Sequence, residues 1–338
     1  MVAIRIEGFS DDLRAAGEAE IREILEAFQS IAPAIPESAS LWRLDHIDEV
    51  LVTPSIEEVV REHLRPELGD IADTYRSARH GMSVQGYTAS RIEGEELRSR
   101  LILAADGMGD WQPPSRLYRT MTLCHEVFHA VLRRSRFERD GPRGPREEWR
   151  VDDLLSVILG IATEEYRVDK LTDRFIYGFF RDDQGRPIET HRLMVAAGWG
   201  YLDGAIGIVN AILNQFIQAF WKLDRGEIDI VGHMNQTSNF IVDVMAWLAH
   251  LSAVHDSLDG WAEDEAQFMA SDGYSRFLFD AWPKVHQFWL LKWDSDDQAA
   301  VDAVEADAQT AVKSIFARCG VDMTDIEDGI YWNATLLL

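Results

Sequence analysis

The order of apolar and polar residues changes from a mixed pattern in about the first hundred residues to a helical pattern afterwards. Apolar residues recur at helical spacing over residues 11–31 and over residues 55–64, where a serine and a glutamate stand at capping-box spacing. Strands are predicted over residues 46–53, 84–92 and 99–105, which are rich in apolar residues and lie between turn-forming segments. These elements predict a small sheet with helices packed on it.

From residue 116 onward the spacing predicts helices, with long ones over residues 116–136 and 152–180. The segment 133–148 is basic and rich in glycine and proline, so we expect an exposed connector, with a lid or a docking surface as its alternative role. Further helices are predicted from about residue 190, and few strands are expected there. We therefore expect an α+β fold with two domains, residues 1–185 and a mainly helical, acidic and tryptophan-rich domain of residues 186–338.

The composition is that of a folded protein with an excess of acidic residues. The 58 Asp and Glu outnumber the 33 Lys and Arg, and the net charge of -25 disfavours nucleic acid as a partner because phosphates are bound by clustered cations. The two cysteines, Cys124 and Cys319, are too few for a disulfide framework, and Cys124 is expected to be a packed thiol. Charged residues appear too early for the apolar core of a signal peptide, so we expect a cytoplasmic location.

Residues 204–221 carry no charge and have the length of a membrane span. Asn210, Asn214 and Gln218 recur every fourth residue, however, and would form a polar stripe along one side of a helix. We therefore expect a helix packed within the protein and no membrane span. The tryptophans of the C-terminal region recur at helical spacing and are expected in the core, with a recognition surface as the alternative.

The sequence HEVFH at residues 125–129 is the short motif with the sharpest chemical meaning. Residues four positions apart lie on one face of a helix, so the imidazoles of His125 and His129 can bind one metal ion. Glu126 lies roughly 100° around the helix from His125. This position suits a general base acting on a water molecule at the metal better than it suits a ligand. Two core histidines that bind nothing are the structural alternative.

A catalytic zinc site needs a third protein ligand, and the helix predicted over residues 152–180 carries carboxylates among apolar turns. Glu164 and Glu165 both have apolar neighbours at helical spacing, so amphipathicity does not choose between them. Asp169 follows Glu165 by four residues and can accept the second N–H of a ligating imidazole. Glu165 is therefore the predicted ligand, with Glu164 as its competitor and a surface ion pair as the structural alternative.

With these residues the chain resembles the gluzincin metallopeptidases, which combine an HExxH helix with a glutamate ligand and a nearby aspartate on a following helix. More loosely, it resembles their cytoplasmic ImmA/IrrE-type members. The resemblance rests on HEVFH at residues 125–129, on EYRVD at residues 165–169 and on the strand RLILAAD before the HExxH helix. It covers about residues 80–180.

The resemblance implies a zincin-like domain and a zinc-dependent endopeptidase that hydrolyses a protein or peptide substrate. It implies that His125, His129 and Glu165 hold Zn²⁺ and that Glu126 activates water. It also implies that the edge strand of the sheet holds an extended substrate by strand addition.

Peptide hydrolysis also needs a donor toward the oxyanion, and the sequence offers several. The candidates are Tyr166, Tyr177, His191, Tyr201 and His233.

Two other functions fit the sequence. A regulatory or protein-binding module that keeps the metal for structure would need a fourth protein ligand, whereas a catalytic site leaves that position to water. An all-helical scaffold in which the motif is a coincidence would bind no metal.

Overall fold

The computed structural model describes most of the chain, as two compact units. Described are residues 2–31, 43–68, 72, 78–79, 82–83, 85–108, 116–140, 149–181, 184–186, 201–256, 262–294, 298–327 and 329–336. Contacts group residues 1–144 with 171–198 in the first unit and residues 145–170 with 199–338 in the second. Each unit has a hydrophobic core of its own.

The first unit contains a four-stranded sheet with flanking helices. In chain order its elements are β1 (Ala3–Ile6), α1 (Asp11–Ile31), β2 (Ile47–Thr53), α2 (Ile56–Leu68), β3 (Ala78–Arg79), β4 (Met82–Ser83), β5 (Gly86–Glu93), β6 (Glu96–Ala104), α3 (Ala105–Met108), α4 (Arg116–Asp140) and the C-terminal part of α5 (Val151–Phe179). The strand order is β1-β2-β6-β5. Strands β1, β2 and β6 run parallel, and β5 pairs antiparallel with β6 at the edge of the sheet.

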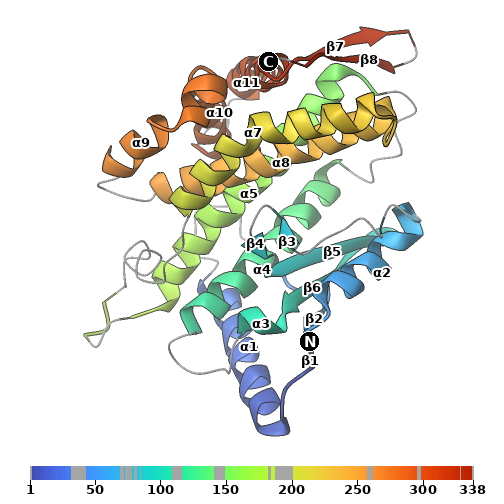
Figure 1. The fold of residues 1–338 in the computed structure, drawn as a ribbon. Helices are drawn as coiled ribbons and strands as arrows, with labels where there is room; N and C mark the ends of the chain where they lie inside the picture. The colour runs from blue at the N-terminus through green and yellow to red at the C-terminus, as the bar shows by residue number, and fades with distance from the viewer. Residues whose placement is uncertain are drawn as a thin grey trace. The chain divides into compact units, whose positions relative to one another are not determined.

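Helices cover both faces of this sheet (Figure 1). Ala89 of β5 clusters with Leu51 and Ile102 of the inner strands and with apolar residues of α2. Thr88, its neighbour on β5, instead contacts α4 through its hydroxyl group. Since successive side chains of a strand point to opposite faces, α2 and α4 lie on opposite sides of the sheet.

The second unit is an assembly of helices that ends in a β-hairpin. It combines the N-terminal part of α5 with α7 (Tyr201–Asp224), α8 (Ile230–His255), α9 (Ala262–Met269), the π-helix η5 (Tyr274–Leu278), α10 (Trp282–Asp294), α11 (Gln298–Arg318), β7 (Val321–Ile326) and β8 (Gly329–Ala334). Trp247, Trp282 and Trp289 are buried in its core, as expected, whereas Trp221 is exposed.

Helix α7 contains the uncharged stretch 204–221. Its apolar residues pack into the core of the second unit, while Asn210, Asn214 and Gln218 are exposed and form the predicted polar stripe. No helix in the described parts of the chain combines the length and apolarity needed to cross a membrane.

The fold class is α+β, as predicted. Helix α1 has the predicted bounds, and the three predicted strands are present as β2, β5 and β6. Strand β1 was not predicted, because its four residues are too few to show a period and it is defined by pairing with β2.

The C-terminal hairpin was not predicted either. Val321 and Met323 of β7 are buried and alternate with exposed residues, which is a strand period that the helical interpretation of this region overlooked. The hairpin also holds the beginning of α5, since the backbone N–H of Val151 donates a 2.8 Å hydrogen bond to Asp325 Oδ1. A free N–H in the first turn of α5 is thereby satisfied.

Helix α4 is longer than predicted. It continues beyond residue 136 to Asp140, into the segment expected to be an exposed connector. The side chain of Arg134 pairs with Glu138 one turn later and with Asp45 before β2, both at 2.6 Å. The prediction was wrong at this end because the charges pair at helical spacing, and no glycine or proline interrupts the helix before residue 141. The rest of the expected connector lies outside the described residues.

Helix α5 is continuous over 29 residues and contributes to both units. Its residues up to Lys170 belong to the second unit, and those from Leu171 belong to the first. The predicted domains 1–185 and 186–338 stay a prediction, because compactness alone does not test whether either part folds independently.

Candidate metal centre

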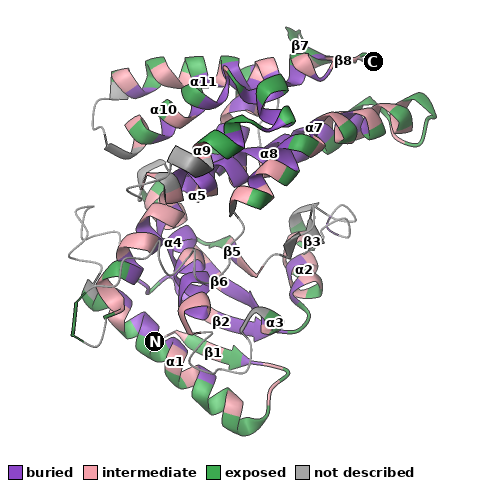
Figure 2. Ribbon diagram, turned by 60° about the vertical axis from the view of Figure 1, so that its left-hand side comes forward, coloured by how far each residue is buried: buried purple, intermediate pink, exposed green. Residues whose placement is uncertain are grey.

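Helix α4 is buried over most of its circumference. Over residues 119–132, every residue except the half-buried His125 is buried (Figure 2). The ring of Phe128 lies against Phe28 of α1, with the ring centroids 4.9 Å apart. Little solvent therefore reaches this part of α4, and its polar side chains need partners within the protein.

The first of these buried polar groups is Arg119. Its guanidinium donates two hydrogen bonds to the carboxylate of Glu20 on α1, at 2.7 and 2.8 Å. Paired bonds of this kind are both strong and directional. They hold α4 against α1 in a defined rotation about its own axis, and this rotation decides where the motif side chains point.

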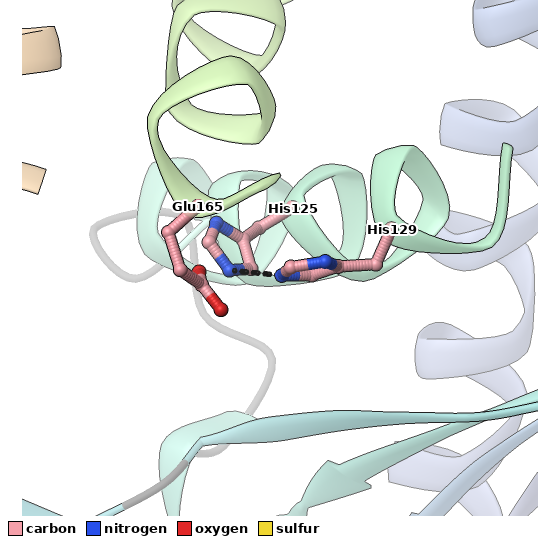
Figure 3. Close-up of side chains that lie close together, drawn as sticks. All are labelled: His125, His129 and Glu165. Atoms are coloured by element: carbon pink, nitrogen blue, oxygen red, sulfur yellow. Dashed lines mark hydrogen bonds between the residues drawn. The ribbon is translucent and has the colours of Figure 1, made fainter. Parts of the chain in front are cut away.

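His125 and His129 lie on one face of α4, as their spacing predicts (Figure 3). Their Nε2 atoms are 3.1 Å apart. Zinc binds imidazole nitrogen at about 2.0–2.1 Å in tetrahedral geometry, which separates two such nitrogens by roughly 3.3 Å. The two rings therefore point toward one position, at nearly the separation that a shared metal ion requires.

Helix α5 supplies Glu165 at the same position. The C-terminal part of α5 packs in the first unit, where Phe175 lies against Phe28 with centroids 5.5 Å apart. Further up the same helix, the carboxylate of Glu165 lies beside the two imidazole rings (Figure 3). One ligand atom from each of His125, His129 and Glu165 lies within 4.8 Å of the other two.

The competing candidate Glu164 does not join this group within the described part of the chain. The group contains a buried histidine, His129, with His125 and Glu165 half-buried. Three protein ligands would leave the fourth position of a tetrahedral zinc ion to water or to another ligand.

The donor set fits a zinc ion. Two imidazole nitrogens and one carboxylate oxygen are the ligands that catalytic zinc sites use, whereas Ca²⁺ and Mg²⁺ prefer oxygen alone. Cys124, next to His125, is buried, and this burial raises the pKa of its thiol well above the ordinary value. Cys124 is therefore held as a thiol and not as the thiolate that binds metals.

Glu126 lies next to the histidines with its carboxylate against strand β5. The hydroxyl of Thr88 lies 2.7 Å from Glu126 Oε2 and 2.8 Å from the backbone oxygen of Glu126. A Cβ atom at Gly86 would lie only 2.5 Å from Glu126 Oε1. The carboxylate therefore occupies space that exists because position 86 is a glycine.

Asp169 has a partner that the sequence analysis did not name. Its Oδ2 lies 2.6 Å from Nδ1 of His250 on α8. The other ring nitrogen of His250, Nε2, lies 3.9 Å from Oε2 of Glu165. A carboxylate only accepts hydrogen bonds, so Nδ1 carries the proton and the ring is oriented with Nε2 toward Glu165. The predicted role of Asp169 beside a ligating histidine stays a prediction.

The candidate oxyanion donors have different surroundings. Tyr166 is buried and donates a 2.5 Å hydrogen bond to the aspartate that follows α8. His233 is buried and accepts a 3.0 Å hydrogen bond from the indole N–H of a tryptophan on β8. Tyr177 is exposed near the end of α5. His191 lies outside the described residues, as does the side chain of Tyr201.

Three residues of this centre were missed by the sequence analysis: Gly86, Thr88 and His250. His250 lies 81 residues beyond Asp169 and belongs to no motif, so no short spacing marks it. Strand alternation does put Gly86 and Thr88 on one face of the strand predicted over residues 84–92. What the sequence lacks is a sign that this face meets the HExxH helix.

Comparison of the chain with protein-family models, with curated proteins and with solved structures finds no match. The interpretation of the centre therefore rests on its own residues and their geometry.

If Glu165 is the third ligand, Glu165→Ala should weaken zinc binding by about 100-fold or more, since even the loss of a group that only orients a ligand costs 10- to 100-fold. Glu164→Ala is the matched control, because it removes the adjacent glutamate from the same helix. Zinc dissociation constants from competition with a chromogenic chelator measure both. Equal effects of the two substitutions would contradict the assignment of Glu165.

Proposed function

We propose that this protein is a zinc-dependent metallopeptidase of the gluzincin type, with a looser likeness to the ImmA/IrrE-type members. The observation that supports this most strongly is the convergence of ligand atoms from His125, His129 and Glu165 within 4.8 Å. Glu126, the residue after the first ligand, is the base in this proposal. A cytoplasmic location is part of the proposal, supported by the two cysteines, which are both free thiols.

A zinc ion held by these three residues would polarise the scissile carbonyl and acidify a water molecule. Glu126 accepts a proton from the attacking water and returns it to the leaving amine nitrogen. Its carboxylate is buried, which keeps competing bulk water away from the proton transfer. The bond broken is the peptide C–N bond, and the products are a carboxylate and an amine.

The substrate in this proposal is an extended protein or peptide segment. Strand β5 is the last strand of the sheet, and its outer edge pairs with no other strand among the described residues. Such an edge offers backbone N–H and C=O groups to an incoming strand, apart from the backbone oxygen of Thr88, which accepts a hydrogen bond from Arg133. Since Thr88 of β5 touches Glu126, a peptide added at this edge would lie close to the proposed base.

His250 is the donor that we propose for the oxyanion. Asp169 orients its ring, and Nε2 lies 3.9 Å from Oε2 of Glu165. When Nε2 carries a proton, it can donate to the negative charge that develops on the carbonyl oxygen. Tyr166 and His233, two of the residues considered from the sequence, each have a structural hydrogen bond instead.

The alternative is a regulatory or protein-binding module with a structural metal, and the position of His250 favours this alternative too. Nε2 of His250 lies 3.9 Å from Oε2 of Glu165. When Nε2 carries no proton, its lone pair is available to bind the metal ion that Glu165 would hold. Coordination by His250 would close the site with a fourth protein ligand and leave no position for water. His250 would thus donate a hydrogen bond to the oxyanion in the peptidase, and would bind the metal in the structural site.

Glu126→Gln should abolish peptide cleavage without loss of zinc. The zinc-loaded protein is incubated with a peptide library made from a proteome digest, and new termini are identified by mass spectrometry. The amide cannot take up the proton, so cleavage should fall by about 10²- to 10⁴-fold. Glu138→Gln, an exposed position on the same helix, is the control and should cleave like the wild type. Cleavage that persists in Glu126→Gln would refute the proposed mechanism.

His250→Ala separates the catalytic function from the structural one. In the peptidase, this substitution should lower cleavage by about 10²-fold or more and leave zinc affinity nearly unchanged, because His250 is not a ligand. The control is His286→Ala, which removes another aspartate-paired histidine of the second unit. A fall in zinc affinity as large as that of Glu165→Ala would instead identify His250 as a fourth ligand and favour the structural site.

A further inference from the structure

The carboxylate of Glu126 is held by strand β5, which lies outside every motif of the sequence. Glu126 is only 5% exposed, and Thr88 only 3%. A buried carboxylate requires hydrogen-bond donors. Among the described residues, the hydroxyl of Thr88 is the donor that reaches the Glu126 carboxylate.

The hydroxyl of Thr88 has one proton and two acceptors within reach, Oε2 and the backbone oxygen of Glu126. A charged carboxylate is the stronger acceptor, so the proton is directed to Oε2. The described residues donate no hydrogen bond to the other oxygen, Oε1. Oε2 of the base is thus held by a hydrogen bond, while Oε1 lies against Gly86 and accepts no hydrogen bond from the described residues.

Gly86 completes this arrangement from the same face of β5, two residues before Thr88. A Cβ atom at position 86 would meet Oε1 of Glu126 at 2.5 Å and Cγ at 2.6 Å. The strand is itself held to α4, because Arg133 donates a 2.6 Å hydrogen bond to the backbone oxygen of Thr88. Two hydrogen bonds therefore fix β5 relative to the base: the one from the Thr88 hydroxyl to Glu126, and the one from Arg133 to the backbone oxygen of Thr88.

We propose that Thr88 is a positioning residue for the proposed base, holding Oε2 of Glu126 so that Oε1 is directed to the attacking water, with Gly86 providing the space. This inference rests on the proposed function. The same strand would then carry the substrate on its outer edge and hold the base with one face. Substrate backbone and base are thereby fixed relative to each other by a single element.

The first test compares Thr88→Val, which keeps the branched shape and removes the hydroxyl, with Thr88→Ser, which keeps the hydroxyl. A base misplaced by about 1 Å loses about 10- to 100-fold in kcat. Thr88→Val should show this loss with KM and zinc affinity unchanged, and Thr88→Ser should restore kcat to within a few-fold. Thr53→Val is the control, because Thr53 is an equally buried strand threonine whose hydroxyl accepts from the backbone N–H of Ser55.

The second test needs neither zinc nor activity. Melting temperatures of the zinc-free protein are measured for the wild type, Thr88→Val, Glu126→Gln and the double variant. If the hydroxyl holds the carboxylate, Thr88→Val should lower the melting temperature by several degrees. In the Glu126→Gln background the same substitution should have less than half of this effect, because the charged acceptor is gone.

The outcomes of the two tests are distinct. Coupling in the melting temperatures together with a selective loss of kcat supports the positioning role. Additive melting temperatures, or a Thr88→Val variant with wild-type kcat, overturn it even when the protein is a peptidase. A wild-type protein that cleaves nothing overturns the proposed function, and the melting temperatures alone then decide whether Thr88 holds Glu126.

Discussion

The burial of α4 is the constraint on which the rest of the centre depends. A helix that is buried over residues 119–132 and still carries charged and polar side chains must satisfy each of them inside the protein. Arg119 is satisfied by Glu20 of α1, and Glu126 by Thr88 of β5. These contacts come from different neighbours and hold α4 in one rotation, which determines the side of the helix on which His125 and His129 lie. Ligand atoms of the two histidines and of Glu165 lie within 4.8 Å of one another. A metal ion bound there would give the two histidines a partner inside the protein as well.

Elements with a strong local period could be predicted from the sequence, and elements defined by pairing could not. Helix α1 was predicted because its apolar residues recur over six turns, and β2, β5 and β6 because strand-like segments lie between turn-forming ones. Strand β1 exists through its parallel pairing with β2, a long-range contact without a local signal. The last turns of α4 were taken for a connector because charge was weighed above helix propensity, although Arg134 and Glu138 stand at ion-pair spacing.

Some residues of the candidate centre could likewise be predicted from local spacing, and others could not. His125 and His129 follow from helix geometry, and Asp169 was the reason to prefer Glu165 over Glu164. Ligand atoms of Glu165 and of the two histidines lie within 4.8 Å of one another, yet Asp169 pairs with His250, on a helix far along the chain. Side chains such as His250 and Thr88 enter the centre through tertiary packing, and one sequence carries no signal for contacts of that kind. The convergence of His125, His129 and Glu165 could thus be predicted from the sequence, whereas the contacts of His250 and Thr88 could not.

The central claim is that His125, His129 and Glu165 hold a zinc ion. Its most direct test is the zinc content per chain after incubation with zinc and removal of unbound metal by gel filtration, for the wild type and for a His125→Ala, His129→Ala double variant. The account predicts about one zinc per wild-type chain and none in the double variant, with both proteins folded by circular dichroism. A wild-type chain that retains no stoichiometric zinc, or a double variant that retains as much as the wild type, would contradict it.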